Sequence, residues 1–524
     1  MIGPLRIALL AAVLAGPWPA NAADLWGLAV GIDDYQHVRK LQGAVSDAND
    51  IKTALTRLGA KQVVLLANEQ ATKPNIIAEW KALTAAARPG DTMVVSFAGH
   101  GGAQAGPGGS AVRFVALPNF QIKDTTSDEV FRDSDFGDLL RSAPQLKIIF
   151  VVDACHSGTM TRSYGQSDLS VRSIETIDSP TLRAASRSLA EEEEGLTLPF
   201  VTHLGAVRTD EVVPEIQIDG HKRGAMSYAF ARSLEGAADT DKDGEISGPE
   251  LTAYITTVVS QKSEGMQHPV ISVPQSWSLN FTAPSVAAQL ISLRTVPIAI
   301  VDTGGRDPAA IVKGLQDSEL ADKSQATLIW DVERGQIRNG FGDLVANVSA
   351  PAQGADPIAP PLLQEVQRVF DKIATVEALK ADTTAHPLQI SLAPDDKVHR
   401  AGTQLSFNIA QSPYRYLTLF DLASDGTVNF LYPLNTQEHR DPPEIAHDQP
   451  YSLPLTATPP FGADHLVAIM SADPLPALHS LLAEIDGKPS ARLLGTRLSD
   501  ILAGKTYQIG LYPSFTEAAA DPAK

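Results

Sequence analysis

The stretch "LKIIFVVDACHSG" (residues 146–158) decides the fold. An apolar run ends abruptly at Asp153, and Cys155, the only cysteine in the 524 residues, follows two positions later. A short and uninterrupted apolar run is typical of a strand buried on both faces, as in a parallel sheet covered by helices. Polar side chains directly after such a strand lie at the carboxyl edge of the sheet, where α/β proteins bind ligands. The stretch therefore predicts an α/β fold with Cys155 at its binding edge.

The residues before this stretch alternate between strand-like and helix-like patterns. Apolar runs predict strands at 25–32, 61–68, 91–98 and 146–152, and helical spacing of apolar residues predicts helices at 44–59, 72–87 and 136–143. This alternation is typical of a mostly parallel sheet with helices on both faces. "AGHGG" (98–102) follows the third strand and "DACHSG" (153–158) follows the fourth. In a parallel sheet both motifs lie at one edge, which brings His100 and Cys155 together.

A histidine and a cysteine at one edge can perform acyl transfer. A thiolate is a strong nucleophile, and a nearby imidazole can take or supply its proton. Gly101 permits close approach of a substrate, and the N–H groups of Gly101 and Cys155 are candidate donors to an oxyanion. The alternative is a buried structural cysteine and an unrelated histidine, but their pairing at strand ends favours catalysis. We find no P-loop and no G-x-S-x-G motif.

Two motifs resemble the catalytic signatures of the caspase-like cysteine peptidases, in particular the metacaspase and bacterial orthocaspase branch. They are "SFAGHGG" (96–102) and "VVDACHSGTMTR" (151–162), and the resemblance extends from "WGLAVGIDDY" (26–35) to "RGAMSYAFARSLEG" (223–236). It implies a caspase-hemoglobinase-like mostly parallel sheet over residues 24–283. It also implies Cys155 as nucleophile, His100 as general base and acid, and Gly101 and Cys155 as oxyanion donors.

The resemblance further implies an acidic pocket for the side chain before the scissile bond. The matching residues are Asp47 and Asp153, and two carboxylates favour arginine or lysine there. The alternatives are a charge at a helix N-terminus for Asp47 and a loop-ordering hydrogen bond for Asp153. The polar segment 163–199 lies where caspase-like enzymes can be cut. Candidate self-cleavage sites are Arg162, Arg172, Arg183 and Arg187, and the alternative is an uncut surface loop.

"DTDKDGEISGPE" (239–250) matches the template of an EF-hand calcium loop. We predict a Ca²⁺ site with the ligand residues Asp239, Asp241, Asp243, Glu245 and Glu250, and no organic cofactor. A solitary exported loop of this kind binds at about 10⁻⁴–10⁻³ M, which favours a structural role. The alternative is an acidic surface turn that binds no metal.

The pattern of residues 1–22 predicts a signal peptide. Arg6 precedes an apolar core at 7–16, and Ala20-Asn21-Ala22 offers a cleavage site. We therefore expect an exported protein, periplasmic or extracellular, with no membrane span. One cysteine excludes an internal disulfide, and the net charge of −19 disfavours nucleic acid as a partner.

The second half has a different pattern. We predict a mixed α/β region at 284–387 with a long helix at 362–381, a β-sandwich-like module at 388–515, and a tail at 516–524. "ASDG" (423–426) between alternating apolar runs predicts a hairpin. Residues 416–433 and 459–474 resemble an uncharacterised β-module that often accompanies bacterial caspase-like domains.

Three functions remain open at the level of sequence. The leading hypothesis is an exported cysteine endopeptidase that cuts peptide or protein substrates after basic residues. The rival is a catalytically silent, calcium-stabilised binding protein that acts through the β-module. A non-proteolytic thiol hydrolase is the third. The sequence does not determine the oligomeric state.

Overall fold

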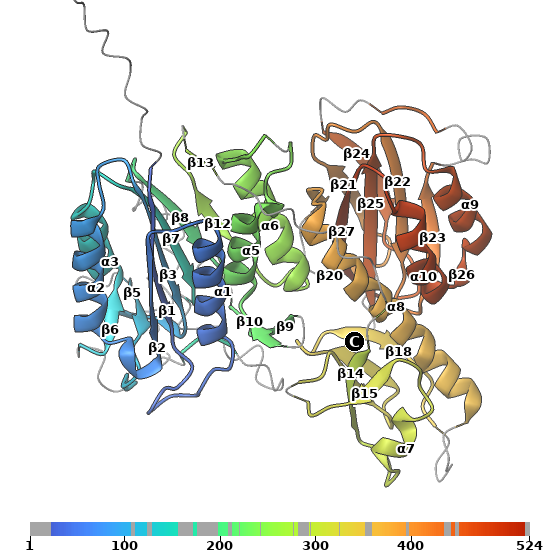
Figure 1. Cartoon of the computed structure of the whole chain (residues 1–524). Helices are drawn as coiled ribbons and strands as arrows, with labels where there is room; N and C mark the ends of the chain where they lie inside the picture. Colours follow the sequence, from blue (N-terminus) through green and yellow to red (C-terminus); the bar gives the residue numbers. More distant parts are fainter. Residues whose placement is uncertain are drawn as a thin grey trace, which may run out of the picture.

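The computed structural model of the chain is shown in Figure 1. It describes residues 23–105, 111–122, 128–155, 171–174, 198–207, 212–218, 221–241, 243–275, 277–280, 293, 295–323, 325–351, 359–394, 398–433, 442–445 and 450–518. The predicted signal peptide and most of segment 163–199 lie outside these residues. Among the described residues, no helix combines the length and apolar character needed to cross a bilayer.

The first half is built on a six-stranded sheet in the order β12-β8-β7-β3-β1-β2. Its strands are β1 (Leu25–Gly31), β2 (Gln62–Ala67), β3 (Thr92–Ala98), β7 (Lys147–Asp153), β8 (Val201–Gly205) and β12 (Val270–Ser272). Neighbouring strands run parallel except β12, which pairs antiparallel with β8 at the edge. The mostly parallel α/β sheet predicted from the sequence is confirmed.

Helices cover both faces of this sheet, as Figure 1 shows. Ile148 and Phe150 of β7 pack with α2 (Lys73–Ala86) and α3 (Asp133–Arg141) on one face. Ile149 and Val151 pack with α1 (Ala44–Arg57), α5 (Ala225–Arg232) and α6 (Gly248–Lys262) on the other. Since successive strand residues point to opposite faces, a strand covered on both sides needs an unbroken apolar run.

Short elements complete the first half. They are η1 (Asn68–Gln70), η3 (Ser233–Ala237), the sheet β4 (Gly101–Ala105), β5 (Ala111–Ala116) and β6 (Val130–Arg132), the hairpin β9 (Ile216–Ile218) and β10 (His221–Arg223), and the pair β11 (Glu245–Ser247) and β13 (Ser278–Asn280). The strand β4 begins directly after His100, and the β9–β10 hairpin follows the loop that faces Cys155.

The middle of the chain is a five-stranded sheet in the order β15-β14-β16-β17-β18. Its elements are β14 (Val296–Val301), α7 (Pro308–Val312), β15 (Ser318–Leu320), β16 (Leu328–Asp331), β17 (Gln336–Asn339) and β18 (Leu344–Asn347). The 26-residue helix α8 (Pro360–Ala385) packs Val366 and Phe370 against Trp330 of this sheet. The same helix continues into the C-terminal core through Val376 and Leu379, so it joins the two cores.

The C-terminal region is β-rich, as predicted. A six-stranded sheet, β20-β27-β25-β22-β23-β26, faces a three-stranded sheet, β19-β21-β24. The bounds are β19 (Ile390–Ala393), β20 (Val398–Arg400), β21 (Gln404–Ile409), β22 (Tyr416–Leu422), β23 (Thr427–Tyr432), β24 (Tyr451–Thr456), β25 (Ala463–Ser471), α9 (Pro476–Ile485), β26 (Lys488–Pro489), α10 (Ala491–Leu502) and β27 (Tyr507–Glu517). Leu419 and Phe407 pack between the sheets, while α8, α9 and α10 cover the other face of the larger one.

Two features of this region bear on the sequence analysis. The antiparallel pair β22–β23 confirms the hairpin predicted at 423–426, where Gly426 adopts a φ of 85°. The helices α9 and α10 were not predicted from the sequence, although Leu478 and Leu482, and Leu494 and Leu498, repeat at the four-residue spacing of a buried helix face.

Candidate active site

The strands β3 and β7 place His100 and Cys155 at the same carboxyl edge of the sheet. Ala98 pairs with Asp153 in the parallel register, so β3 and β7 end at the same level. His100 lies two residues after the end of β3, and Cys155 lies two residues after the end of β7. His100 and Cys155 are 1% and 0% exposed.

The imidazole of His100 is held in one orientation. Its Nε2 lies 2.7 Å from the carbonyl oxygen of Arg39, and because a carbonyl only accepts, we assign the ring proton to Nε2. Nδ1 then carries the lone pair, and it has no hydrogen-bond partner among the described residues. The backbone N–H of His100 donates to the Tyr35 hydroxyl at 2.8 Å, and the two rings lie 4.7 Å apart. Burial lowers the pKa of His100 to about 4, so the ring is neutral at pH 7.

The thiol of Cys155 is also neutral in this state. Burial raises the pKa of Cys155 to about 12, although the backbone N–H of Val213 donates to Sγ at 2.8 Å and opposes the rise. The dyad candidates are therefore a thiol and a neutral imidazole with its lone pair at Nδ1.

The predicted oxyanion donors converge on a carbonyl of the chain itself. The backbone oxygen of Arg172 accepts hydrogen bonds from Gly101 N at 3.0 Å and from Cys155 N at 3.3 Å. A side chain at position 101 would overlap the carbonyl oxygen of Cys155, so glycine is required at this close approach.

The side chain of Arg172 lies between the two predicted pocket residues and a third carboxylate. The guanidinium forms an ion pair with Asp47 Oδ2, its Nη1 lies 3.1 Å from Asp153 Oδ1, and its Nη2 lies 3.8 Å from Glu215 Oε1. All four side chains are 0% exposed. Segment 163–199 had the alternative interpretation of an uncut surface loop. That interpretation is wrong for residues 171–174. Arg162, Arg183 and Arg187 lie outside the described residues.

Each of the three carboxylates is fixed by backbone N–H groups. Asp47 accepts from Gly224 N at 3.0 Å, Asp153 from Ser227 N at 2.8 Å, and Glu215 from Gly43 N at 2.8 Å. The partner of Asp153 lies in the helix α5, so this bond ties Asp153 to a helix and does not test the loop-ordering alternative. These backbone bonds therefore orient each carboxylate beside the guanidinium of Arg172.

The charges in this cluster act on one another strongly. Burial raises the pKa of Asp47 well above its usual range despite the nearby guanidinium. Burial also works against the charged form of Arg172, but the carboxylates of Asp153, Asp47 and Glu215 outweigh it and raise the pKa of the guanidinium. The pocket is therefore a buried acidic site that holds one cation.

Comparison with known proteins identifies this half of the chain. The sequence model of the family described as Caspase domain matches residues 25–276, and that of a Domain of unknown function (DUF4384) matches residues 398–474. Residues 25–276 are caspase-like and are called the caspase domain after the family model that they match. The resemblance to caspase-like and metacaspase peptidases predicted from the motifs is confirmed.

Relatives of the caspase domain include plant and fungal metacaspases. Metacaspase-2 of Arabidopsis thaliana is 30% identical over 141 residues, which cover 25% of this chain and 34% of that one. Metacaspase-1B of Aspergillus fumigatus is 24% identical over 251 residues, covering 40% and 61%. The solved structure of pro-sf-caspase-1 is similar at 13% identity and a TM-score of 0.31, covering 51% of this chain and 95% of that one. The chain spans about a third to three fifths of the length of these two metacaspases.

The acidic loop of the caspase domain gathers three of its five predicted ligand residues. Carboxylate oxygens of Asp239, Asp241 and Asp243 lie within 4.8 Å of one another. The side chain of Glu245 is not part of this group, and its backbone N–H donates to Asp243 Oδ1. Glu250 instead accepts from Ser247 N at 2.9 Å and from Thr240 N at 2.8 Å, and so caps α6. The three aspartates suit a hard cation, and Glu250 would have to turn to join them.

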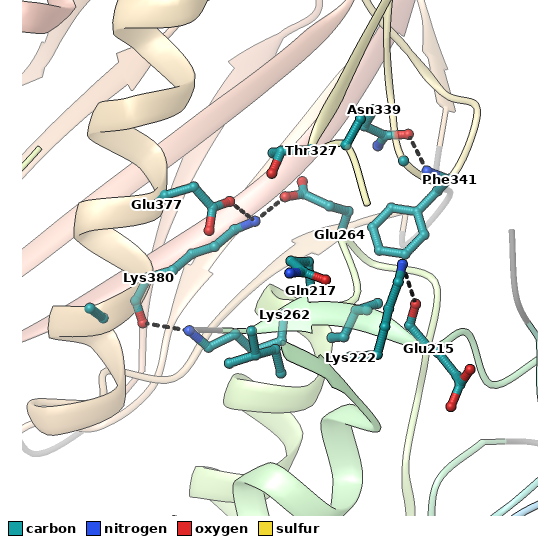
Figure 2. A pocket seen from close by; sticks show the side chains of 15 residues that line it. Glu215, Gln217, Lys222, Lys262, Glu264, Thr327, Asn339, Phe341, Glu377 and Lys380 are labelled. Carbon is teal, nitrogen blue, oxygen red and sulfur yellow. Dashed lines mark hydrogen bonds and ion pairs between the residues drawn. The ribbon is translucent and has the colours of Figure 1, made fainter. Parts of the chain in front are cut away.

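A separate cavity of about 110 Å³ lies where the caspase domain meets the middle sheet and α8 (Figure 2). Glu215 borders it from the active-site side, and Phe341 and Lys380 border it from the second half. Lys380 pairs with Glu264 and lies 2.9 Å from Glu377, while Lys222 donates to the backbone oxygen of Glu215 at 3.4 Å. Cys155 and His100 do not line this cavity, so it is separate from the candidate active site.

Sequence reasoning missed three groups of the site. Glu215 comes from a part of the chain distant from Asp47, Tyr35 contributes its hydroxyl, and Arg39 acts through its backbone oxygen. Tyr35 had a visible signal, because it ends the "WGLAVGIDDY" block (26–35) of the family resemblance. Glu215 lies between that block and "RGAMSYAFARSLEG" (223–236), within the span of the same resemblance.

We predict that Tyr35→Phe destabilises the caspase domain by about 1–3 kcal/mol, because the buried N–H of His100 loses its acceptor. Chemical denaturation followed by fluorescence measures the change. The control is Tyr416→Phe, whose hydroxyl bonds an exposed Glu444 and whose loss should cost less than about 0.5 kcal/mol. Equal stability of the two variants would contradict the role assigned to Tyr35.

Proposed function

We propose that the chain is an exported cysteine endopeptidase of the caspase type that cuts after arginine, with Cys155 as nucleophile and His100 as general base and acid. The observation that carries this proposal is the placement of Arg172. Its carbonyl oxygen accepts from both candidate oxyanion donors while its side chain fills the acidic pocket. A substrate residue before a scissile bond must present these two groups in the same way.

The geometry supports a two-stage hydrolysis. His100 Nδ1 takes the proton of the Cys155 thiol, and the thiolate attacks the peptide carbonyl carbon. The N–H groups of Gly101 and Cys155 stabilise the negative oxygen, a contribution worth about 10²–10³ in rate for a single donor. His100 then protonates the leaving amine, and water releases the acyl group from Cys155. The Arg39 carbonyl keeps the proton on Nε2 and so keeps Nδ1 available.

The pocket favours arginine over lysine. The planar guanidinium presents separate N–H groups to Asp47 and Asp153 at once, whereas an ammonium is a single point charge. Glu215 adds a third negative charge at 3.8 Å. A substrate aspartate would bring a fourth carboxylate into the same buried space, which like-charge repulsion opposes.

We predict that the reduced protein, expressed from Ala23, hydrolyses fluorogenic peptides ending in arginine faster than those ending in lysine, and does not cut after aspartate. Cys155→Ala should abolish turnover. Glu215→Gln keeps the shape of the side chain but removes its charge, and should lower kcat/KM for arginine peptides about 10-fold or more. The control is Glu69→Gln at an exposed position, which should leave kcat/KM unchanged.

Three results would count against this function. Cleavage after aspartate would overturn the assignment of the pocket but keep the nucleophile. Hydrolysis of non-peptide esters alone would favour a thiol hydrolase. No Cys155-dependent turnover of any peptide would favour the binding protein that acts through its β-module.

We also propose that residues 239–250 bind Ca²⁺ as a structural ion. At a Kd of about 1 mM, 10 mM Ca²⁺ should stabilise the folded protein by roughly 1.4 kcal/mol. Thermal unfolding with and without Ca²⁺ measures this, and Asp241→Asn should remove the shift while the exposed control Asp500→Asn keeps it. An identical unfolding temperature with and without Ca²⁺ would contradict the site.

A further inference from the structure

The cavity at the boundary between the caspase domain and the second half of the chain is bordered by three lysines. Its volume of about 110 Å³ is room for several water-sized groups, since each group needs about 10–15 Å³. Lys222 comes from β10, Lys262 is the last residue of α6, and Lys380 comes from α8 (Figure 2). Both halves of the chain therefore bring positive charge to this cavity.

The lysines differ in what each ammonium group contacts. Lys380 pairs with Glu264 and, at 2.9 Å, with Glu377, so two carboxylates already face it. Lys262 donates to the backbone oxygen of Lys380 at 3.3 Å. Lys222 donates to the backbone oxygen of Glu215 at 3.4 Å, and no carboxylate of the described residues lies within ion-pair distance of it. An ammonium group has three N–H donors, so the described residues leave two donors of Lys222 for a ligand.

The surroundings of Lys222 also favour an added anion. Burial lowers the pKa of Lys222, against the opposing effect of the Glu215 carboxylate. A partly buried ammonium gains from an added anion, because charge-assisted hydrogen bonds are about twice as strong as neutral ones. Phe341 borders the same cavity and packs against the caspase-domain core, so the cavity also offers an apolar surface.

We propose that this cavity binds a small organic acid that has one carboxylate and a short apolar chain. The carboxylate accepts from Lys222, Lys262 adds positive charge, and the apolar chain lies against Phe341. One negative charge suits the cavity better than the double charge of a phosphate. Glu264 and Glu377 border the same space and repel further negative charge.

The hairpin that carries Lys222 also contributes to the acidic pocket. Directly before β9, Glu215 lies 3.8 Å from the guanidinium of Arg172. Directly after β10, Gly224 N donates to Asp47 at 3.0 Å. A carboxylate bound to Lys222 favours the hairpin arrangement that presents both groups to the pocket. Under the peptidase function proposed above, on which this step rests, the bound acid strengthens the binding of arginine substrates.

The binding test compares butyrate with butyramide, which has nearly the same shape without the charge. Isothermal titration calorimetry of the full chain at constant ionic strength should show one site for butyrate and none for butyramide. Lys222→Met removes the ammonium group and should weaken butyrate binding about 10-fold or more, because a hydrogen bond to a charged group is worth at least that much. The control Lys505→Met removes an exposed lysine outside the cavity and should bind butyrate like wild type.

Three results would overturn the site. They are equal binding of butyrate and butyramide, displacement of butyrate by an equal concentration of inorganic phosphate, and unchanged butyrate binding by Lys222→Met. Lys222→Arg keeps the positive charge and should bind butyrate within a few-fold of wild type. If Lys222→Met does not fold, Lys222→Arg and the comparison of the two probes on wild type decide the question.

The effect on peptide hydrolysis separates this inference from the proposed function. Saturating butyrate should lower the KM of wild type for an arginine peptide about 5-fold, and should not change the KM of Lys222→Met. If butyrate binds but the KM of wild type stays the same, the link to the acidic pocket is wrong. If no peptide is cut at all, the proposed function fails, while the titration still decides whether the cavity binds the acid.

Discussion

A buried guanidinium among three carboxylates holds the active site together. Arg172 connects Asp47 at the start of α1, Asp153 at the end of β7 and Glu215 before β9, three points that lie far apart in the sequence. Charges removed from water in this way are stable only when they are paired and hydrogen-bonded, and loss of one partner of a buried pair costs about 3–5 kcal/mol. The backbone N–H bonds to each carboxylate meet that requirement from the protein side. The proposed preference of this pocket for a cation follows from that requirement.

In the proposed function, recognition of charge and placement of the reacting carbon both depend on one residue. The residue that carries the cation is also the one whose carbonyl oxygen accepts from Gly101 N and Cys155 N. Glu215 belongs to this pocket and also borders the cavity between the caspase domain and the second half of the chain. There, although burial opposes its ionisation, Lys380 and His465 hold the pKa of Glu264 well below its usual range. The ion pair of Glu264 with Lys380 and its hydrogen bond with His465 attach α8 and β25 to the caspase domain beside the pocket that holds Arg172.

The sequence predicted those parts of the molecule that depend on local patterns. The unbroken apolar run at 148–152 required a strand covered on both faces, and the polar residues after two such strands led to His100 and Cys155 at one edge. The hairpin at 423–426 followed from turn chemistry of the same local kind. These features depend on residues that are adjacent in the chain, so they can be predicted from the sequence alone.

The remaining features arise from contacts between distant residues. Glu215 joins the pocket through bonds to residues 42 and 43, and Arg39 contributes a backbone carbonyl that no side-chain motif can show. Arg172 was one of four candidate arginines in a polar segment, and its ion pairs join carboxylates that are far apart in the sequence. At the predicted calcium loop, the template indicated Glu250 as a ligand. In the structure its carboxylate caps α6, because Ser247 and Thr240 offer nearby donors.

The central claim is that Cys155 reacts with carbonyl groups carried by an arginine in the acidic pocket. The most direct measurement is covalent labelling with a peptidyl arginyl electrophile, followed by mass spectrometry of the intact chain. Cys155 is the only cysteine, so the site of a thiol adduct is unambiguous. We expect one adduct on Cys155, formed rapidly by the arginyl reagent and slowly or not at all by its uncharged norleucyl analogue. Equal labelling by the two reagents, or no adduct on Cys155, would contradict the account.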